Sequence, residues 1–230
     1  LIGPIGVVLG YAFSFMPFII KRYKTYRISK KEFSLLKEKI PFMRDSYGHS
    51  ILSVFGTYAD KLIVGPLFGF AFLGNYQLAF QILMILTMIS GIVFTYLLPQ
   101  EASGKPHRKL WLITILIVLV SSILTIVLAP SVLPILMPKY VPAIDLIQIM
   151  SIAAVSMTIT LRYTSKFLAN EKSKIVIIGK AIYLSSHMIG IFSIGTIFGI
   201  QGVAISFVIA SSIEAIYFVT VNRILDNKNK

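Results

Sequence analysis

The 230-residue chain contains no cysteine and few charged residues, and both absences narrow its class. Without cysteine it has no disulfide bonds, no thiolate chemistry and no cysteine-ligated metal. Charged residues make up 13% of the sequence, about half the share typical of soluble domains, and hydrophobic residues make up 56%. Together with a mean hydropathy of +0.83, this composition indicates an integral membrane protein.

The sequence also lacks the signatures of catalysis. Its three histidines, His49, His107 and His187, lie on different segments without the spacing of a metal site. There is no glycine-rich phosphate loop, no nucleophile elbow and no paired carboxylates. We therefore expect neither an enzyme nor a resident cofactor.

The apolar residues form long continuous runs, which predicts membrane-spanning helices, because the strands of a membrane barrel would alternate apolar and polar residues. A membrane core of ~30 Å needs ~20 residues per helix. The expected fold class is all-α, a polytopic transmembrane helix bundle of about seven spans. The predicted spans are residues 1–20, 47–69, 74–98, 110–130, 143–167, 175–197 and 201–222.

The chain opens at Leu1, inside the first apolar run, and no basic segment precedes that run as it would in a signal peptide. We therefore expect a fragment that has lost its N-terminal portion.

The basic residues indicate an orientation. Nearly all of the 22 Lys and Arg residues lie in segments 21–46, 99–110, 162–174 and 223–230. With seven spans, these segments fall on one side of the membrane, which the positive-inside rule makes the cytoplasmic side. The net charge of +13 is then explained by topology and not by nucleic-acid binding. We expect the tail, residues 223–230, in the cytoplasm and the protein in the cytoplasmic membrane.

Two connections between spans have recognisable features. In the basic linker 21–46, Ser29 and Glu32 form a capping box, the apolar residues that follow share one face, and Pro41 should end the helix. This pattern predicts an amphipathic helix on the membrane surface, attracted to anionic lipids, although a plain basic linker is the alternative. On the outer side, four prolines in 129–145 exclude one regular helix, and we expect a short interfacial segment around 132–137.

Polar residues inside the spans mark candidate functional positions. Asp60 and Lys61 are adjacent within the second span, where one charged group costs roughly 3 kcal/mol. His49, Ser53, Gly56 and Asp60 share one helix face, which indicates packing against protein or a water-filled cavity. Similar stripes on later spans contain Gln77, Gln81, Arg162, Lys166, Lys180, His187 and Glu214.

Each of these positions also has a structural interpretation. Lys61, Arg162, Lys166 and Lys180 could extend to the lipid headgroups. The spans that carry Lys180 and Glu214 should be antiparallel neighbours, so this pair could be a structural ion pair. His187 could make a helix–helix hydrogen bond, whereas the burial of Asp60 is hardest to explain without a functional cavity.

Five segments of the sequence follow one another in a recognisable order. An acid-base-apolar-glycine passage at 58–65 (YADKLIVG) is followed by 73–79 (LGNYQLA), and then by 97–99 (LLP), 134–143 (PILMPKYVPA) and 198–204 (FGIQGVA). In these segments and their order the sequence resembles the polysaccharide flippases of the multidrug/oligosaccharidyl-lipid/polysaccharide exporter superfamily.

The resemblance implies a division into four parts. Residues 1–20 would be the helix that ends a first lobe, 21–46 the linker, 47–222 a six-helix C-terminal lobe and 223–230 the tail. The lobe would move a polyprenyl-linked oligosaccharide by alternating access, together with a missing N-terminal lobe or a second copy. The cavity would be lined by Asp60, Lys61, Gln77, Gln81, Arg162, Lys180, His187 and Glu214.

The resemblance also leaves alternatives open. Asp60 or Glu214 could bind the coupling ion, H⁺ or Na⁺. A cation-coupled drug or metabolite antiporter of the same fold is the first alternative. A non-transporting membrane scaffold for polysaccharide synthesis is the second. The expected partners are membrane lipids and the lipid-linked glycan.

Overall fold

The computed structural model describes residues 13–14, 16–17, 30–104 and 107–228, and they contain helices and turns but no strands. The chain divides into two compact units, Leu1–Pro41 and Phe42–Lys230. Most of the predicted first span, 1–20, and residues 21–29 of the predicted linker lie outside the described residues.

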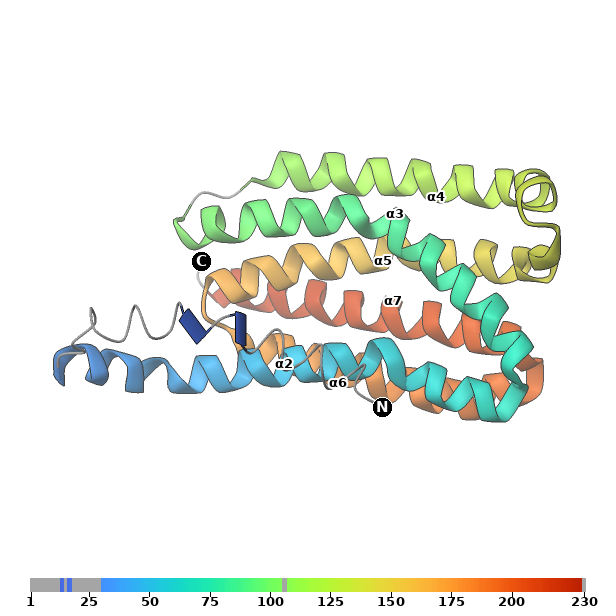
Figure 1. Ribbon diagram of the computed structural model, residues 1–230. Coiled ribbons are helices and arrows are strands. Elements are labelled where there is room, and N and C mark those ends of the chain that lie inside the picture. The colour runs from blue at the N-terminus through green and yellow to red at the C-terminus, as the bar shows by residue number, and fades with distance from the viewer. Residues whose placement is uncertain (1–12, 15, 18–29, 105–106, 229–230) are drawn as a thin grey trace. The chain divides into compact units, whose positions relative to one another are not determined.

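Long helices make up the described chain from Lys30 onward, and the first of them begins before the second unit does (Figure 1). Helix α2 covers Lys30–Phe68, α3 covers Phe70–Ala102, and α4 covers Arg108–Leu136. A 3₁₀ turn, η1, at Pro138–Ala143 leads into α5, Ile144–Ala169. Helix α6, Ser173–Gly190, continues through the π-helical turn η2, Ile191–Gly195, into α7, Thr196–Lys228.

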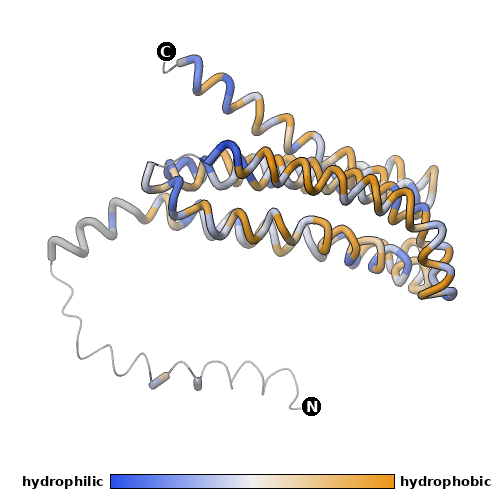
Figure 2. The backbone as a smooth tube through the Cα atoms, turned by 90° about the horizontal axis from the view of Figure 1, so that it is seen from above, coloured by the Kyte–Doolittle hydropathy of each residue, from blue (hydrophilic) through white to orange (hydrophobic). Residues whose placement is uncertain are grey.

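Five helical stretches in the described part of the chain are long and apolar enough to cross a membrane. Hydrophobic residues dominate the middle of the helices (Figure 2). The last stretch, Ser173–Asn227, has 55 residues, far more than the ~20 that one crossing needs. This architecture fits a multi-pass membrane protein; the prediction of seven spans is not confirmed.

The last stretch is long because it folds back on itself. Gly199 has φ 61° and ψ −141°, a conformation that favours glycine, and it interrupts the helix. On either side of this turn, Gly190 contacts Ser206 and, farther away, Gly179 contacts Phe218. Residues farther before the turn thus contact residues farther after it. This pattern shows that α6 and most of α7 form an antiparallel hairpin, as the sequence predicted.

Helix α5 lies at the centre of the packing, against α3, α4 and α7. The apolar core around it includes Leu83, Met150, Ala154 and Phe207, each at most 2% exposed. Polar contacts also link the helices, because lipid offers no other partner for a hydroxyl group. The hydroxyls of Ser90 and Thr158, for example, lie 2.8 Å apart between α3 and α5.

Three expectations about helix ends were wrong. Pro41 does not end a helix, because α2 runs through it. The turn between the second and third spans is not 69–74 but Gly69 alone, whose φ of 96° breaks the helix before α3 begins at Phe70. Helix α4 passes through Pro130 and Pro134 and ends only at Leu136.

Helix α4 tolerates Pro130 because a neighbouring helix replaces the lost hydrogen bond. Proline has no N–H, so the carbonyl of Ile126, four residues earlier, loses its helical donor. The side-chain amide of Gln148 on α5 donates to this oxygen at 2.8 Å. The segment 129–145 is nevertheless not one regular helix, as predicted, since Met137 and η1 interrupt it.

Candidate functional site

The carboxylate of Asp60 is completely buried, and it is held by groups from two helices. The Tyr76 hydroxyl on α3 donates to Asp60 Oδ2 at 2.6 Å. On α2 itself, the backbone N–H of Lys61 donates to Oδ1 at 2.8 Å, and the Lys61 Nζ lies 3.3 Å from the same oxygen. Both oxygens of the carboxylate therefore accept hydrogen bonds from other groups of the protein.

A third helix brings His187 to the same carboxylate. The His187 Nε2 lies 3.9 Å from Asp60 Oδ2, and the imidazole is as buried as the carboxylate. This Nε2 has no hydrogen-bond partner among the described residues. The other ring nitrogen, Nδ1, lies 3.2 Å from the Ser206 hydroxyl on α7. We call Asp60, Lys61, Tyr76, His187 and Ser206 the Asp60 cluster.

The hydrogen bonds of Ser206 bear on which imidazole nitrogen carries a proton. The Ser206 hydroxyl has a single proton, and it donates that proton to the Val203 carbonyl at 2.8 Å. In the neutral tautomer that donates from Nδ1 to Ser206, Nε2 carries a lone pair. Nε2 and Asp60 Oδ2 are then two acceptors that lie 3.9 Å apart.

Aromatic rings enclose the cluster and keep water away from it. Phe207 packs edge-on against His187 with ring centroids 5.4 Å apart, Tyr183 stacks on His187 at 5.8 Å, and Tyr183 and Phe207 also contact each other. The Lys61 ammonium lies 3.7 Å from the centroid of the Phe80 ring, a cation–π contact, and also donates to the Thr57 carbonyl. These contacts satisfy Lys61 without a path to the headgroups.

Lys180 and Glu214 form a second ion pair beside the cluster, as predicted. The Lys180 Nζ lies 4.0 Å from Glu214 Oε2 and 4.3 Å from the centroid of the Tyr183 ring. Because Tyr183 also stacks on His187, one ring separates the two ionic groups. Gly56 allows this arrangement, since a Cβ there would lie 3.3 Å from Tyr183 Cε1.

The other predicted site residues lie elsewhere. Gln77 is half-buried and Gln81 is exposed on α3, and neither makes a hydrogen bond within the described residues. Arg162 lies in a separate cavity at one end of the bundle. The structure therefore groups Asp60, Lys61, Lys180, His187 and Glu214, and it does not bring Gln77, Gln81 or Arg162 to them.

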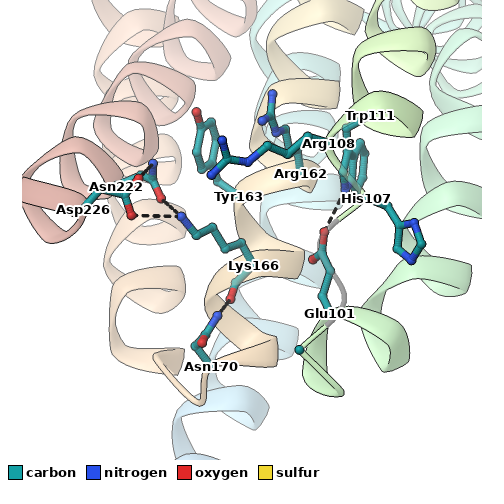
Figure 3. A pocket seen from close by; sticks show the side chains of 11 residues that line it. Glu101, His107, Arg108, Trp111, Arg162, Tyr163, Lys166, Asn170, Asn222 and Asp226 are labelled. Atoms are coloured by element: carbon teal, nitrogen blue, oxygen red, sulfur yellow. Dashed lines mark hydrogen bonds and ion pairs between the residues drawn. The ribbon is translucent and has the colours of Figure 1, made fainter. Parts of the chain in front are cut away.

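We call this separate cavity the end cavity. It has a volume of about 380 Å³ and lies where α3, α5 and α7 end and α4 begins (Figure 3). Figure 3 shows Lys166 reaching from α5 to the side chains of Asn222 and Asp226 on α7. The lining residues are Glu101, Gly104, His107, Arg108, Trp111, Arg162, Tyr163, Lys166, Asn170, Asn222 and Asp226.

Sequence reasoning did not assign a role to Tyr76 or Ser206. Tyr76 could have been found, because it follows the Gly69 turn at about the distance by which Asp60 precedes it, so a hairpin brings them together. Ser206 carries no such signal, since serine is common in membrane helices. Among the described residues, no three His, Asp or Glu side chains are grouped to hold a metal ion.

The helices and buried ionic groups define a multi-pass helical membrane protein with an ionisable cluster in its interior. No protein-family model, curated protein or solved structure matches the chain.

Proposed function

We propose that this chain forms the C-terminal lobe of a flippase that moves a polyprenyl-linked oligosaccharide across the cytoplasmic membrane by alternating access. One observation carries the proposal. The two sequence segments that resemble the flippase family, 58–65 and 73–79, meet through the hydrogen bond from Tyr76 to Asp60. The shared pattern thus coincides with a buried ionic contact, which is costly in a membrane unless it has a use.

The Asp60 cluster supplies the coupling step. A proton that enters between Asp60 and His187 changes the charge of a group that α2, α3 and α6 share. Neutral Asp60 holds Lys61 and Tyr76 less strongly than the carboxylate does, since charge-assisted hydrogen bonds are about twice as strong as neutral ones. The ion therefore favours the state in which these helices separate, and a difference in affinity between two states is what shifts a conformational equilibrium. Na⁺ would act by binding the carboxylate oxygens directly.

We assign the substrate contacts to Lys61 of this cluster and to Gln77 and Gln81, which lie on α3 apart from it. Lys61 has 14% of its side chain exposed, Gln77 is half-buried, and Gln81 is exposed. A cation and two amides suit the diphosphate and hydroxyl groups of a lipid-linked glycan. Alternating access also requires a second lobe, either an N-terminal half or a second copy of this chain.

The test is Asp60→Asn in the full-length protein, with glycan export measured in cells. Asparagine keeps the size of the side chain and an oxygen that can accept from Tyr76, but it cannot take up a proton. We expect export to fall to background at normal expression. The matched control is Asp145→Asn, which alters an exposed carboxylate that binds Gln201 at 2.9 Å, and it should export normally. Normal export by Asp60→Asn would contradict the proposal.

A cation-coupled drug or metabolite antiporter of the same fold is the second candidate, because a buried carboxylate couples ions whatever the cargo. The same two variants distinguish the candidates. Loss of efflux of a drug cation with glycan export intact would favour the antiporter. A scaffold subunit without transport would tolerate Asp60→Asn in both assays.

A further inference from the structure

The end cavity has an excess of one positive charge, because three cationic side chains line it together with two carboxylates, Glu101 and Asp226. The cationic side chains are Arg108 from α4, and Arg162 and Lys166 from α5. Lys166 is already neutralised, because its Nζ lies 3.2 Å from Asp226 and 2.6 Å from the Asn222 side-chain oxygen. Neither arginine lies within 4.0 Å of a carboxylate in the described part of the chain.

The cavity's other carboxylate, Glu101, is hydrogen-bonded to neutral groups and not to the arginines. Glu101 accepts from the Trp111 indole N–H at 3.2 Å through one oxygen and from the Ser165 hydroxyl at 2.5 Å through the other. Each oxygen is thus held by a neutral donor and oriented toward it. The two guanidinium groups are left with open donors in the same cavity, where Arg162 contacts the Tyr163 ring at 5.5 Å.

The position of Arg108 favours a further anion, although Arg108 already interacts electrostatically with Asp226 across the cavity. It is the first residue of α4, and a helix N-terminus carries partial positive charge from its free N–H groups. Asp or Glu is the usual occupant there, but the first turn of α4 has no acidic residue and no side-chain cap. By contrast, Lys166 lies in the last turn of α5, where a cation is favourable.

We propose that the end cavity binds a phosphate group, held by Arg108, Arg162 and the first-turn N–H groups of α4. Guanidinium groups bind phosphate through paired hydrogen bonds, and helix N-termini bind anions. The volume of about 380 Å³ is within the range of small-molecule sites, roughly 300–1,000 Å³. The site is independent of the transport function proposed above.

The phosphate group could come from two sources. The cavity lies where membrane-length helices end, which is the level of lipid headgroups, so an anionic phospholipid can present its phosphate there. A soluble phosphate compound can enter from the aqueous side. The chemistry that the protein recognises is the same in both cases, so the experiment has one arm for each source.

Trp111 provides a direct signal, because it is the chain's only tryptophan and lines the cavity. The protein, in nanodiscs of zwitterionic lipid, is titrated with dihexanoyl-phosphatidylglycerol, with inorganic phosphate and with dihexanoyl-phosphatidylcholine. We expect a saturable change in Trp111 emission with the first or second probe. Saturation only by phosphatidylglycerol identifies a lipid headgroup, and saturation by inorganic phosphate in the same concentration range identifies a soluble compound.

Variants test whether the arginines are responsible. Arg108→Gln or Arg162→Gln should weaken binding at least about tenfold, because each removes a charge-assisted contact. The matched control is Lys109→Gln, an exposed neighbour in the same turn that does not line the cavity, and it should bind normally. Arg108 is exposed, so its variant should fold even if Arg162→Gln does not.

A variant that is expected to tighten binding distinguishes phosphate binding from a general loss of structure. Glu101→Gln removes one of the two negative charges of the cavity while keeping an acceptor oxygen for Trp111, so binding of the phosphate probe should become several-fold tighter. The proposal is overturned if neither anionic probe gives a saturable signal, if phosphatidylcholine binds equally well, or if Arg108→Gln binds as the unaltered protein does.

Discussion

The Asp60 cluster and the end cavity both contain ionic groups, but they differ in exposure and in how far those groups are satisfied. The Asp60 and Lys61 side chains are 0% and 14% exposed, whereas Asp226 and Lys166 are 51% and 41% exposed. In the cluster, one carboxylate is shared by three helices. In the end cavity, neither arginine lies within 4.0 Å of a carboxylate among the described residues. The first arrangement links three helices through one buried carboxylate, and the second leaves two guanidinium groups without a close ionic partner.

The largest effect should follow from removing the carboxylate of the cluster. Asp60→Ala leaves a buried ammonium group and the Tyr76 hydroxyl without their partner, and breaking a buried pair in this way costs about 3–5 kcal/mol. We expect the free energy of unfolding to fall by that amount in an SDS titration followed by circular dichroism. Asp60→Asn should lose less, because it still accepts from Tyr76. Equal stability of Asp60→Ala and the unaltered protein would show that the cluster does not join the helices.

A smaller effect should follow from moving the helix that carries Ser206. A Cβ at Gly190 would overlap the Ser206 Cβ and lie 3.3 Å from its Oγ, so Gly190→Ala should push α6 and α7 apart and disturb His187. Overpacking of this kind costs about 1–3 kcal/mol. The control is Gly91→Ala on α3, where a new Cβ has no neighbour within 4 Å; it should be neutral or slightly stabilising. The same SDS titration measures both, and equal stability of the two variants would contradict the packing described here.

The smallest effect should come from the ion pair of the end cavity. Asp226→Asn breaks its contact with Lys166, but both side chains are well exposed, and such pairs contribute less than about 1 kcal/mol. We expect little change in the free energy of unfolding. The small difference between the variant and the unaltered protein should shrink as salt is added, because salt screens exposed charges. A loss as large as that of Asp60→Ala would remove the contrast between the two regions.

The sequence predicted the cluster better than the cavity, for a physical reason. Helical periodicity gives the face of each residue, and the alternating directions of the spans give neighbours at similar depth. That is sufficient for Lys180 with Glu214 and for placing His187 near Asp60. It does not reveal which helices surround the end of α5, and the structure places Arg162 in the end cavity, apart from the residues with which the sequence groups it.

The sequence also predicted several helix ends incorrectly, because helix ends depend on tertiary contacts. Pro130 should weaken α4, yet Gln148 on another helix donates to the carbonyl that Pro130 leaves free. The Gly69 turn needs a single residue in a left-handed conformation, whereas the local composition of 69–74 suggested a longer loop. In both cases the chain satisfies its backbone groups in a way that neighbouring residues in the sequence do not reveal.

The most direct test of the central claim, that the Asp60 cluster couples an ion to the movement of a lipid-linked glycan, is a flipping assay in proteoliposomes. The full-length protein and its Asp60→Asn variant are reconstituted with a fluorescent polyprenyl-linked oligosaccharide, and the rate of flipping is measured with and without an imposed H⁺ or Na⁺ gradient. We predict that a gradient of one ion accelerates flipping by the unaltered protein, and that Asp60→Asn shows no acceleration although it reconstitutes equally well. Equal acceleration in both proteins would contradict the account.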